Sequence, residues 1–486
     1  MNCSSSSWTP FRCGVAAAFV VLAAIGLRLV RLSDDMWLDE IWSVRLSEQM
    51  TTLSSVFTLH HDNNNFLNTL WQWLIGPLAP TWQQRLLTLI AGIAAVPLTM
   101  LVAWQWSPVE RRNATAMLAG VLAAGWQTWI MYSNEARGYA LACALSLATT
   151  ALLPEVCVAR PRRSRLLAFA LLSTVGFVSH LSYLIVFTSQ LIWCTVVVWT
   201  LGDPSTFASG RARVMQVVDR WVALAMLPVG VVAILWVADL RFAAVGGSSE
   251  RDRLGVLIEA LASVAGFLEP LPLALATGAA TIAVLAAGFL VMRRTGTPLA
   301  YYPLILILLS PVILFGLAPT GFVWPRHFMT VSTAALPLMA VALASGLAAA
   351  GSKRLLAIGY LLIFFVGNGL ELERYYRDGR GHYSEAVAWM ASQQPTGVIR
   401  VSGDHTFRQS TLVEHFARRL HLASRFEFIP PQELTSPPDF FLTHDLDRNW
   451  TPPQGFELGP YHLQLSQRYG SIGTVGWPMA IYRPVK

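Results

Sequence analysis

The sequence predicts an α-helical protein that crosses a membrane many times and carries a small α/β domain at its C-terminus. Three observations predict this architecture. Of the 486 residues, 54% are hydrophobic and 13% are charged, whereas soluble domains carry about a quarter charged residues. Apolar runs long enough to cross a bilayer as helix recur along most of the chain. A mixed polar segment begins only after residue 370.

The apolar runs predict about eleven spans. The first ends near residue 32 and lacks a clear small-residue cleavage site, so we interpret it as a retained signal anchor. The stretches 66–79 and 255–268 are too short to cross and are assigned to interfacial or re-entrant positions. The other predicted spans lie near residues 84–106, 114–131, 138–153, 166–182, 184–201, 221–240, 271–292, 299–318, 328–350 and 355–370.

The basic residues predict the orientation of these spans. Cytoplasmic loops are enriched in Lys and Arg, and with the N-terminus inside, the inner loops carry most of them. The net charge of +7 therefore reports topology, and we do not expect nucleic-acid binding. The inner loops contain Arg111, Arg112, the RPRRSR stretch at 160–165, Arg211, Arg213, Arg220, Arg293, Arg294, Lys353 and Arg354.

The same topology places a set of polar residues on the outer face. Ionisable groups at membrane depth are expensive unless they are paired or hydrated, so their gathering at one surface indicates a functional site. The set comprises Asp39, Glu40, His60, His61, Arg85, Glu135, Arg137, His180, Arg326 and His327.

The polar C-terminal part is predicted to be a separate domain on the outer side. We divide the chain into a transmembrane domain of residues 1–370, with an external catalytic loop at 33–83, and a periplasmic α/β domain of residues 371–486. Alternating patterns support the α/β class. Helical spacing occurs at 382–393 and 410–420, and strand-like patterns occur at 397–403, 439–444 and 479–485.

Four motifs resemble those of GT-C fold membrane glycosyltransferases. They are WLDEIWS in the first external loop, LHHDNNNFLNTLWQWL after it, QQRLLTLIAGI at the start of the next span, and YSNEARGYAL. Within that class, the chain is similar to bacterial relatives of protein O-mannosyltransferases and aminoarabinose transferases. The resemblance covers residues 10–370 and implies transfer of a sugar from a polyprenyl phosphate to an acceptor at the outer membrane face.

The resemblance also implies roles for individual residues. Asp39 matches the family's catalytic carboxylate and would be the general base, while Glu40 would orient the loop or acceptor, for example by pairing with Arg85. The departing phosphate calls for guanidinium donors, a role implied for Arg137 and Arg326, with Tyr139 lining the same pocket. His60, His61, His180 and His327 are candidates for binding donor or acceptor.

Each assignment has a structural alternative. Asp39 and Glu40 would otherwise form a solvated interfacial cluster, and Arg137 would form an ion pair with Glu135. An arginine at a span end, such as Arg85, often reaches toward lipid headgroups. For His180 and His327, the alternative is a hydrogen-bonded polar group within a helix bundle. Asp34 and Asp35 lie outside the motif and are interpreted as solubilising charges.

The histidine loop departs from the family pattern. Many relatives have a His-Pro-Pro stretch here, whereas this chain reads HHDNNNF without prolines. A divalent metal ion is implicated in some relatives, but two adjacent histidines do not easily share one ion, so a metal cofactor stays open. Asn63, Asn64 and Asn65 are candidates either for sugar binding or for a simple turn.

Rival functions follow from the same composition. A polyprenyl-linked sugar transporter or flippase would show internal repeats and charges near the midplane, and neither is evident. A non-catalytic lipid-binding membrane protein remains an alternative. An oligosaccharide polymerase or ligase would need a large loop between late spans, which is absent.

The Gly- and Ser-rich segment 241–253 is predicted to be a mobile cover over a lipid donor. We expect a bacterial inner-membrane location and an undecaprenyl-type carrier.

Overall fold

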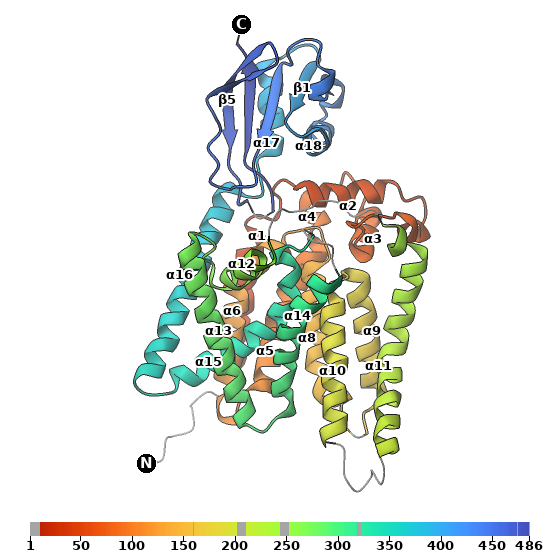
Figure 1. Cartoon of the computed structure of the whole chain (residues 1–486), viewed down its shortest axis with the longest axis vertical. Coiled ribbons are helices and arrows are strands. Elements are labelled where there is room, and N and C mark those ends of the chain that lie inside the picture. Colours follow the sequence, from red (N-terminus) through yellow and green to blue (C-terminus); the bar gives the residue numbers. More distant parts are fainter. Residues whose placement is uncertain are drawn as a thin grey trace. The chain divides into compact units, whose positions relative to one another are not determined.

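The computed structural model describes residues 10–158, 160–201, 210–243, 252–317, 322–473 and 475–485. They form two compact units (Figure 1). The membrane unit consists of residues 1–30, 51–71 and 85–371, and the mixed unit consists of residues 31–50, 72–84 and 372–486. The mixed unit thus joins the C-terminal residues to two parts of the predicted external loop. The division of the chain at residue 370 stays a prediction.

The membrane unit is helical, which confirms the predicted fold class. In the described residues, nine helical segments are long and apolar enough to cross a membrane, and a bent pair supplies a tenth. The predicted span 166–182 corresponds to a helix of 17 residues, the lower limit for crossing. The helices are α1 (Pro10–Leu29), α3 (Phe66–Ile75), α5 (Leu86–Trp106), α6 (Arg112–Gly125), α7 (Gln127–Ser133), α8 (Tyr139–Val156), α9 (Arg163–Ser179), α10 (Tyr183–Leu201), α11 (Gly210–Ala238), α12 (Arg253–Ala265), α13 (Leu271–Arg294), α14 (Tyr301–Leu317), α15 (Ser332–Leu347) and α16 (Ser352–Asp378).

Helix packing places α5 at the centre of one group, in contact with α6, α8 and α15. A second group joins α9, α10 and α11, as Figure 1 shows. The two stretches judged too short to cross form α3 and α12, which have 10 and 13 residues. Of the predicted mobile cover, residues 244–251 lie outside the described part of the chain.

The bent pair is α6 and α7, which meet at an angle of 61°. A break in a helix frees backbone groups that must find partners in the apolar interior. Arg28 of α1 donates from Nη2 to Ala123 O at 3.2 Å and from Nη1 to Ala124 O at 3.4 Å. On the other side, Gln127 N donates to Asn368 Oδ1 of α16 at 3.0 Å. Both side chains are buried, so α1 and α16 each supply a buried polar partner for the break.

The mixed unit is built on a six-stranded sheet with strand order β2-β1-β3-β6-β5-β4. β1 pairs in parallel with β2 and β3, and the other pairs are antiparallel. The five elements predicted for this region correspond to α17, α18, β1, β3 and β6, whereas β2, β4 and β5 were not predicted. The elements are α2 (Leu38–Glu48), α4 (Thr81–Gln84), α17 (Tyr383–Gln393), β1 (Ile399–Gly403), α18 (Thr406–Arg419), β2 (Phe426–Phe428), β3 (Phe440–His444), β4 (Gly455–Leu458), β5 (Tyr461–Tyr469) and β6 (Met479–Pro484).

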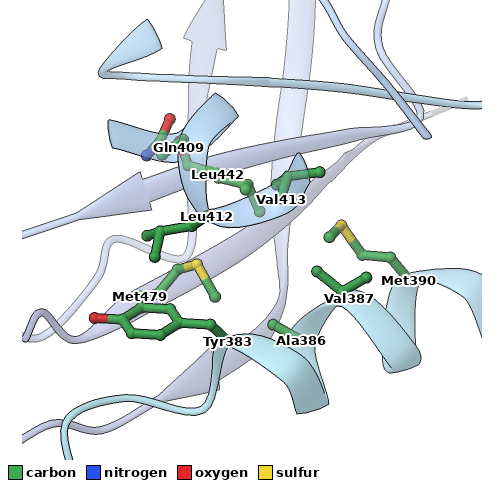
Figure 2. A pocket seen from close by; sticks show the side chains of 9 residues that line it. All are labelled: Tyr383, Ala386, Val387, Met390, Gln409, Leu412, Val413, Leu442 and Met479. Atoms are coloured by element: carbon green, nitrogen blue, oxygen red, sulfur yellow. The ribbon is translucent and has the colours of Figure 1, made fainter. Parts of the chain in front are cut away.

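A small apolar cavity lies between α17, α18 and the sheet (Figure 2). Its volume of about 10 Å³ is near the smallest that holds one water. We therefore interpret it as a packing gap and not as a ligand site. Its lining is formed by Tyr383, Ala386, Val387, Met390, Gln409, Leu412, Val413, Leu442 and Met479.

Helix α2 belongs to the mixed unit, where two partly exposed ion pairs link it to α18. Arg45 Nη2 lies 2.8 Å from Glu414 Oε2, and Arg418 pairs with Glu48. The segment that contains the WLDE motif is thereby attached to the C-terminal α/β fold. Its packing could not be derived from the sequence, since the partners lie more than 360 residues apart.

Protonation of His415 is expected to destabilise the mixed unit at low pH. Burial, joined by the positive charges of Arg419, Arg45 and Arg418, lowers the pKa of His415 to about 3, although Glu40 acts in the opposite direction. Between pH 6.5 and 3 the unfolded chain binds a proton that the folded chain does not, so stability falls as the pH falls. The loss at pH 5 should be about 2 kcal/mol.

Thermal unfolding at pH 7.5 and pH 5 would measure this effect. The variant His415→Phe carries no titratable group and should lose less of its midpoint temperature than the wild type over that range. Equal losses in the two proteins would show that other groups govern the acid sensitivity.

Candidate functional site

The EARGY motif forms a buried loop between α7 and α8. Helix α7 ends at Ser133, and α8 begins at Tyr139 with Gly138 as its N-terminal cap. Within the loop, Arg137 N donates to Glu135 O at 2.7 Å. Glu135 is fully buried and Arg137 is 6% exposed. Two charged side chains are thus held at a helix junction in the apolar unit, where burial has to be compensated.

A hydrogen bond from α3 and close packing at Gly138 hold this loop in place. Asn68 of α3 donates from Nδ2 to Ala136 O. A Cβ atom at Gly138 would collide with the Ser179 carbonyl oxygen and lie 3.1 Å from Asn65 Oδ1. The absence of a side chain at Gly138 therefore lets the end of α9 and the asparagine loop approach the motif.

Substituting Gly138 is expected to disturb the loop. Gly138→Ala places a methyl group against backbone, which cannot move aside as a side chain can, and should destabilise the protein by about 2 kcal/mol. We expect a lower unfolding midpoint and faster amide hydrogen exchange across 134–139. Gly359→Ala is the matched control, because a Cβ there meets nothing within 4 Å. If both variants behaved alike, close packing at Gly138 would not matter.

Five of the predicted site residues come together around this loop. The guanidinium carbon of Arg137 lies 5.3 Å from the Tyr139 ring centre, and the Tyr139 and His180 rings are 4.1 Å apart. The guanidinium groups of Arg137 and Arg326 and the His327 ring lie near enough to His180 to act on it electrostatically. Three separate regions of sequence thus contribute to one basic cluster, which we define as Arg137, Tyr139, His180, Arg326 and His327.

Both histidines of the basic cluster present a donor. His180 Nδ1 accepts a hydrogen bond of 3.1 Å from Ser182 N, so the proton of the neutral ring resides on Nε2. His327 Nδ1 likewise accepts from Trp324 N at 3.1 Å. The cluster therefore combines guanidinium and imidazole N–H donors.

Glu135 is the carboxylate beside this cluster. Its Oε1 lies 3.8 Å from Arg137 Nη1, a long separation for a charge-assisted hydrogen bond. The contact keeps the structural alternative for Arg137, an ion pair with Glu135, open.

Arg85 immediately precedes α5 and is fully buried. Its burial disfavours the alternative that it extends to lipid headgroups. Its backbone carbonyl accepts bonds from Leu89 N at 2.9 Å and Thr88 Oγ1 at 2.8 Å, which tie the residue to the first turn of the helix. Its proposed pairing with Glu40 stays a prediction.

His60 and His61 make contacts of a different kind. The buried carboxylate of Asp239, next to the end of α11, accepts from His60 N at 2.7 Å and lies 3.0 Å from His60 Nδ1. Asp239 also accepts from Asn64 Nδ2 at 3.3 Å. His61 Nδ1 lies 2.9 Å from Asp62 Oδ1. Asp239 thus anchors the histidine loop, a role that the sequence analysis missed.

The described residues contain no group of three His, Cys, Asp or Glu side chains placed to hold a metal ion. His60 and Asp239 supply two ligand atoms that already contact each other, and His61 is directed to Asp62. A divalent cofactor therefore stays open.

Asp39 and Glu40 lie in the first turn of α2, in the mixed unit. Carboxylates are favoured at a helix N-terminus. Glu40 Oε2 accepts from Trp37 N at 3.3 Å, which caps the helix, and it lies 3.9 Å from Arg380 Nε. Glu40 and Arg380 are both buried. Asp39 is partly exposed.

The acidic residues before the motif have structural partners. Asp34 Oδ2 lies 2.9 Å from Arg31 Nη1, and Asp35 Oδ2 accepts from Ser384 N at 2.6 Å. They connect the start of the external segment to the rest of the mixed unit. Their interpretation as solubilising charges was therefore incomplete, since each also makes a local contact.

Comparisons with known proteins find similarity in structure only. The sequence matches no protein-family profile and no curated protein. The crystal structure of ArnT from Cupriavidus metallidurans in the apo state superposes with a TM-score of 0.54, at 13% identity, covering 96% of this chain and 97% of that one. ArnT bound to undecaprenyl phosphate gives the same values.

A second similar structure is an archaeal one. The oligosaccharyltransferase of Archaeoglobus fulgidus in the apo form has a TM-score of 0.50 and 11% identity, covering 87% of this chain and 65% of that one. At such identities the similarity concerns the fold.

Proposed function

We propose that this chain, which has the GT-C fold of membrane glycosyltransferases, transfers a sugar from a polyprenyl phosphate to an acceptor at the outer membrane face. The observation that carries the proposal is the basic cluster. Arginine and histidine N–H groups gather at helix ends of a multi-pass membrane protein, and donors of this kind match the oxygens of an anionic ligand such as a phosphate. A lipid-linked phosphate has the required charge at the required depth.

The basic cluster would bind the phosphate of the donor. Arg137 and Arg326 supply planar donor forks that match phosphate oxygens, and Tyr139 lines the same surface. Arg85 is assigned to the same task on the family resemblance. The structure of ArnT with undecaprenyl phosphate supports a polyprenyl phosphate as the ligand. These donors would stabilise the phosphate most as the bond to the sugar breaks and charge develops on the leaving oxygen.

Asp39 would act as the general base. In an inverting displacement, an acceptor hydroxyl attacks the anomeric carbon while the carboxylate takes its proton. The C–O bond to the phosphate breaks, and the polyprenyl phosphate leaves with the bonding electron pair. Glu40, capped onto Trp37 and beside Arg380, would orient the start of α2. His60 and His61 are proposed to contact donor or acceptor from the loop that Asp239 anchors.

The proposal extends to location and partners. We propose an undecaprenyl-type carrier, a bacterial inner-membrane location, and an active site and C-terminal domain that face the periplasm. The acceptor would be a glycan, a lipid or a protein. The alternative function is a transporter or flippase of polyprenyl-linked sugars, or a non-catalytic lipid-binding protein, because a basic cluster alone would also bind a lipid phosphate without reaction.

Turnover separates these alternatives. Purified protein in lipid would be incubated with a panel of polyprenyl-phosphate sugars and a mixed set of acceptors, with and without a chelator, beside a mock purification. Release of one sugar, with free polyprenyl phosphate as the second product, is expected. Loss of release in chelator would identify a metal requirement. Donor binding without release from any member of the panel would contradict the proposal and favour a carrier.

A further inference from the structure

A row of polar contacts lies at one edge of the sheet in the mixed unit. Asp404 directly follows β1, and His444 ends β3, the parallel neighbour of β1. His444 Nδ1 lies 2.9 Å from Asp404 Oδ1, and His444 Nε2 lies 2.9 Å from Arg408 Nη1. A guanidinium has donors only, so Nε2 accepts and the Nδ1 proton is donated to Asp404. Asp404 and His444 thus orient Arg408.

This row of polar contacts lies at the carboxyl end of β1, between the strands that flank it. β2 and β3 flank β1 on opposite sides, so the chain connections diverge at the carboxyl end of β1. In open α/β sheets, ligands bind at this kind of divergence. Arg408 lies on the first turns of α18, which starts at this edge.

The WLDE segment docks at the same edge through aromatic contacts. Trp37, two residues before Asp39, packs edge-on to Trp477 with ring centres 6.5 Å apart. Trp42, three residues after Asp39, stacks on Phe407 at 5.4 Å. The guanidinium carbon of Arg408 lies 4.8 Å from the Trp477 ring centre. The two tryptophans that flank Asp39 therefore contact the two aromatic residues beside Arg408.

The charge of Asp39 acts on Arg408. Burial lowers the pKa of Arg408 from its usual value, and the negative charges of Asp404 and Asp39 act in the opposite direction. Arg408 is therefore a partly buried cation on which two carboxylates act. One follows β1, and the other lies in the first turn of α2.

We propose that Arg408 is a positioning residue for Asp39, supplied by the C-terminal domain and oriented by His444 and Asp404. The inference rests on the proposed function, in which Asp39 is the base. The positive charge of Arg408 attracts the Asp39 carboxylate, and the fixed orientation of the guanidinium restrains the direction of that carboxylate. The C-terminal α/β domain thereby contributes to the reaction without contacting the reacting atoms.

The test compares Arg408→Leu with Arg408→Lys and with the control Arg418→Ala. Arg418 also connects α18 to α2, through Glu48, so its loss weakens docking without removing the charge beside Asp39. We expect kcat of Arg408→Leu to fall about tenfold to a hundredfold, as for a small misplacement of a catalytic group. Its KM for the polyprenyl donor should stay within about twofold, because the phosphate would be bound by the membrane unit. Arg408→Lys should recover part of kcat.

A second readout does not depend on turnover. Carbodiimides modify accessible carboxyl groups, so modification of Asp39, followed by mass spectrometry of the peptide, should be faster in Arg408→Leu, where the guanidinium no longer restrains the carboxylate, and unchanged in Arg418→Ala. Glu40, Asp404, His405 and His444 stay in place in every protein compared. Equal modification in Arg408→Leu and wild type would overturn the inference. Wild type that releases no sugar would overturn the proposed function instead, and the modification rates would still decide the role of Arg408.

Discussion

Asp39→Asn should reduce sugar transfer by at least about a hundredfold, the lower range of the contribution of a general base. Asparagine keeps the size and polarity of the side chain but accepts no proton at neutral pH. Because Asp39 lies on α2 and the proposed phosphate ligands lie on the membrane unit, donor affinity should change little. The measurement is the single-turnover rate at saturating donor, with donor binding determined separately.

The matched control is Asp34→Asn. It removes a carboxylate from the same segment whose partner is Arg31 at 2.9 Å, and it should leave the transfer rate within about twofold because it supplies no base. A transfer rate in Asp39→Asn close to that of the wild type would remove Asp39 from the role of base. Equal losses in both variants would instead indicate that the segment needs its negative charge for folding.

Arg137→Ala should weaken binding of a polyprenyl phosphate about thirtyfold, or about 2 kcal/mol, the usual contribution of a hydrogen bond to a charged group. Arg137 is buried at 6% exposure, and its guanidinium carbon lies 5.3 Å from the Tyr139 ring centre in the basic cluster. Arg137→Lys keeps the charge without the planar fork, so it should lose less. Equilibrium binding of undecaprenyl phosphate by each purified variant provides the measurement.

Two controls separate phosphate binding from the ion pair with Glu135. Glu135→Gln removes the carboxylate 3.8 Å from Arg137 and should not weaken phosphate binding, since it removes a negative charge beside the proposed ligand. Arg112→Ala is the control for the loss of an arginine from an aromatic ring, since the guanidinium carbon of Arg112 lies 4.5 Å from the Trp104 ring centre. If Glu135→Gln reproduced the loss seen in Arg137→Ala, the arginine would be structural.

Local patterns were sufficient to predict the helical membrane unit. A membrane span is recognised from a run of about twenty apolar residues. All the predicted runs coincide with helices or with the bent pair α6 and α7. The bend itself was not predicted, because it depends on Arg28 and Asn368, which are distant in sequence. Among the strands, β2 and β4 are short, with three and four residues, and give little periodic signal. β5 does alternate between buried and exposed positions, so its pattern was present but overlooked.

The sequence suggests candidate residues for the site, but it does not reveal their contacts. Arg137, His180 and Arg326 were selected because charge is rare at membrane depth, and the structure brings them together. The roles of Asp239 and Arg408 were missed because a carboxylate at a helix end and an arginine on a polar helix are each common. Only the three-dimensional contacts with His60 and with His444 distinguish them.

The break between α6 and α7 limits how the protein can be divided. Its freed backbone groups are bound by Arg28, on the first helix of the membrane unit, and by Asn368, on the last. A fragment that lacks either helix would leave a carbonyl pair or an amide without its partner in an apolar interior. Split versions for co-expression would therefore have to supply both helices, whose side chains bind backbone groups 95 and 241 residues away in sequence.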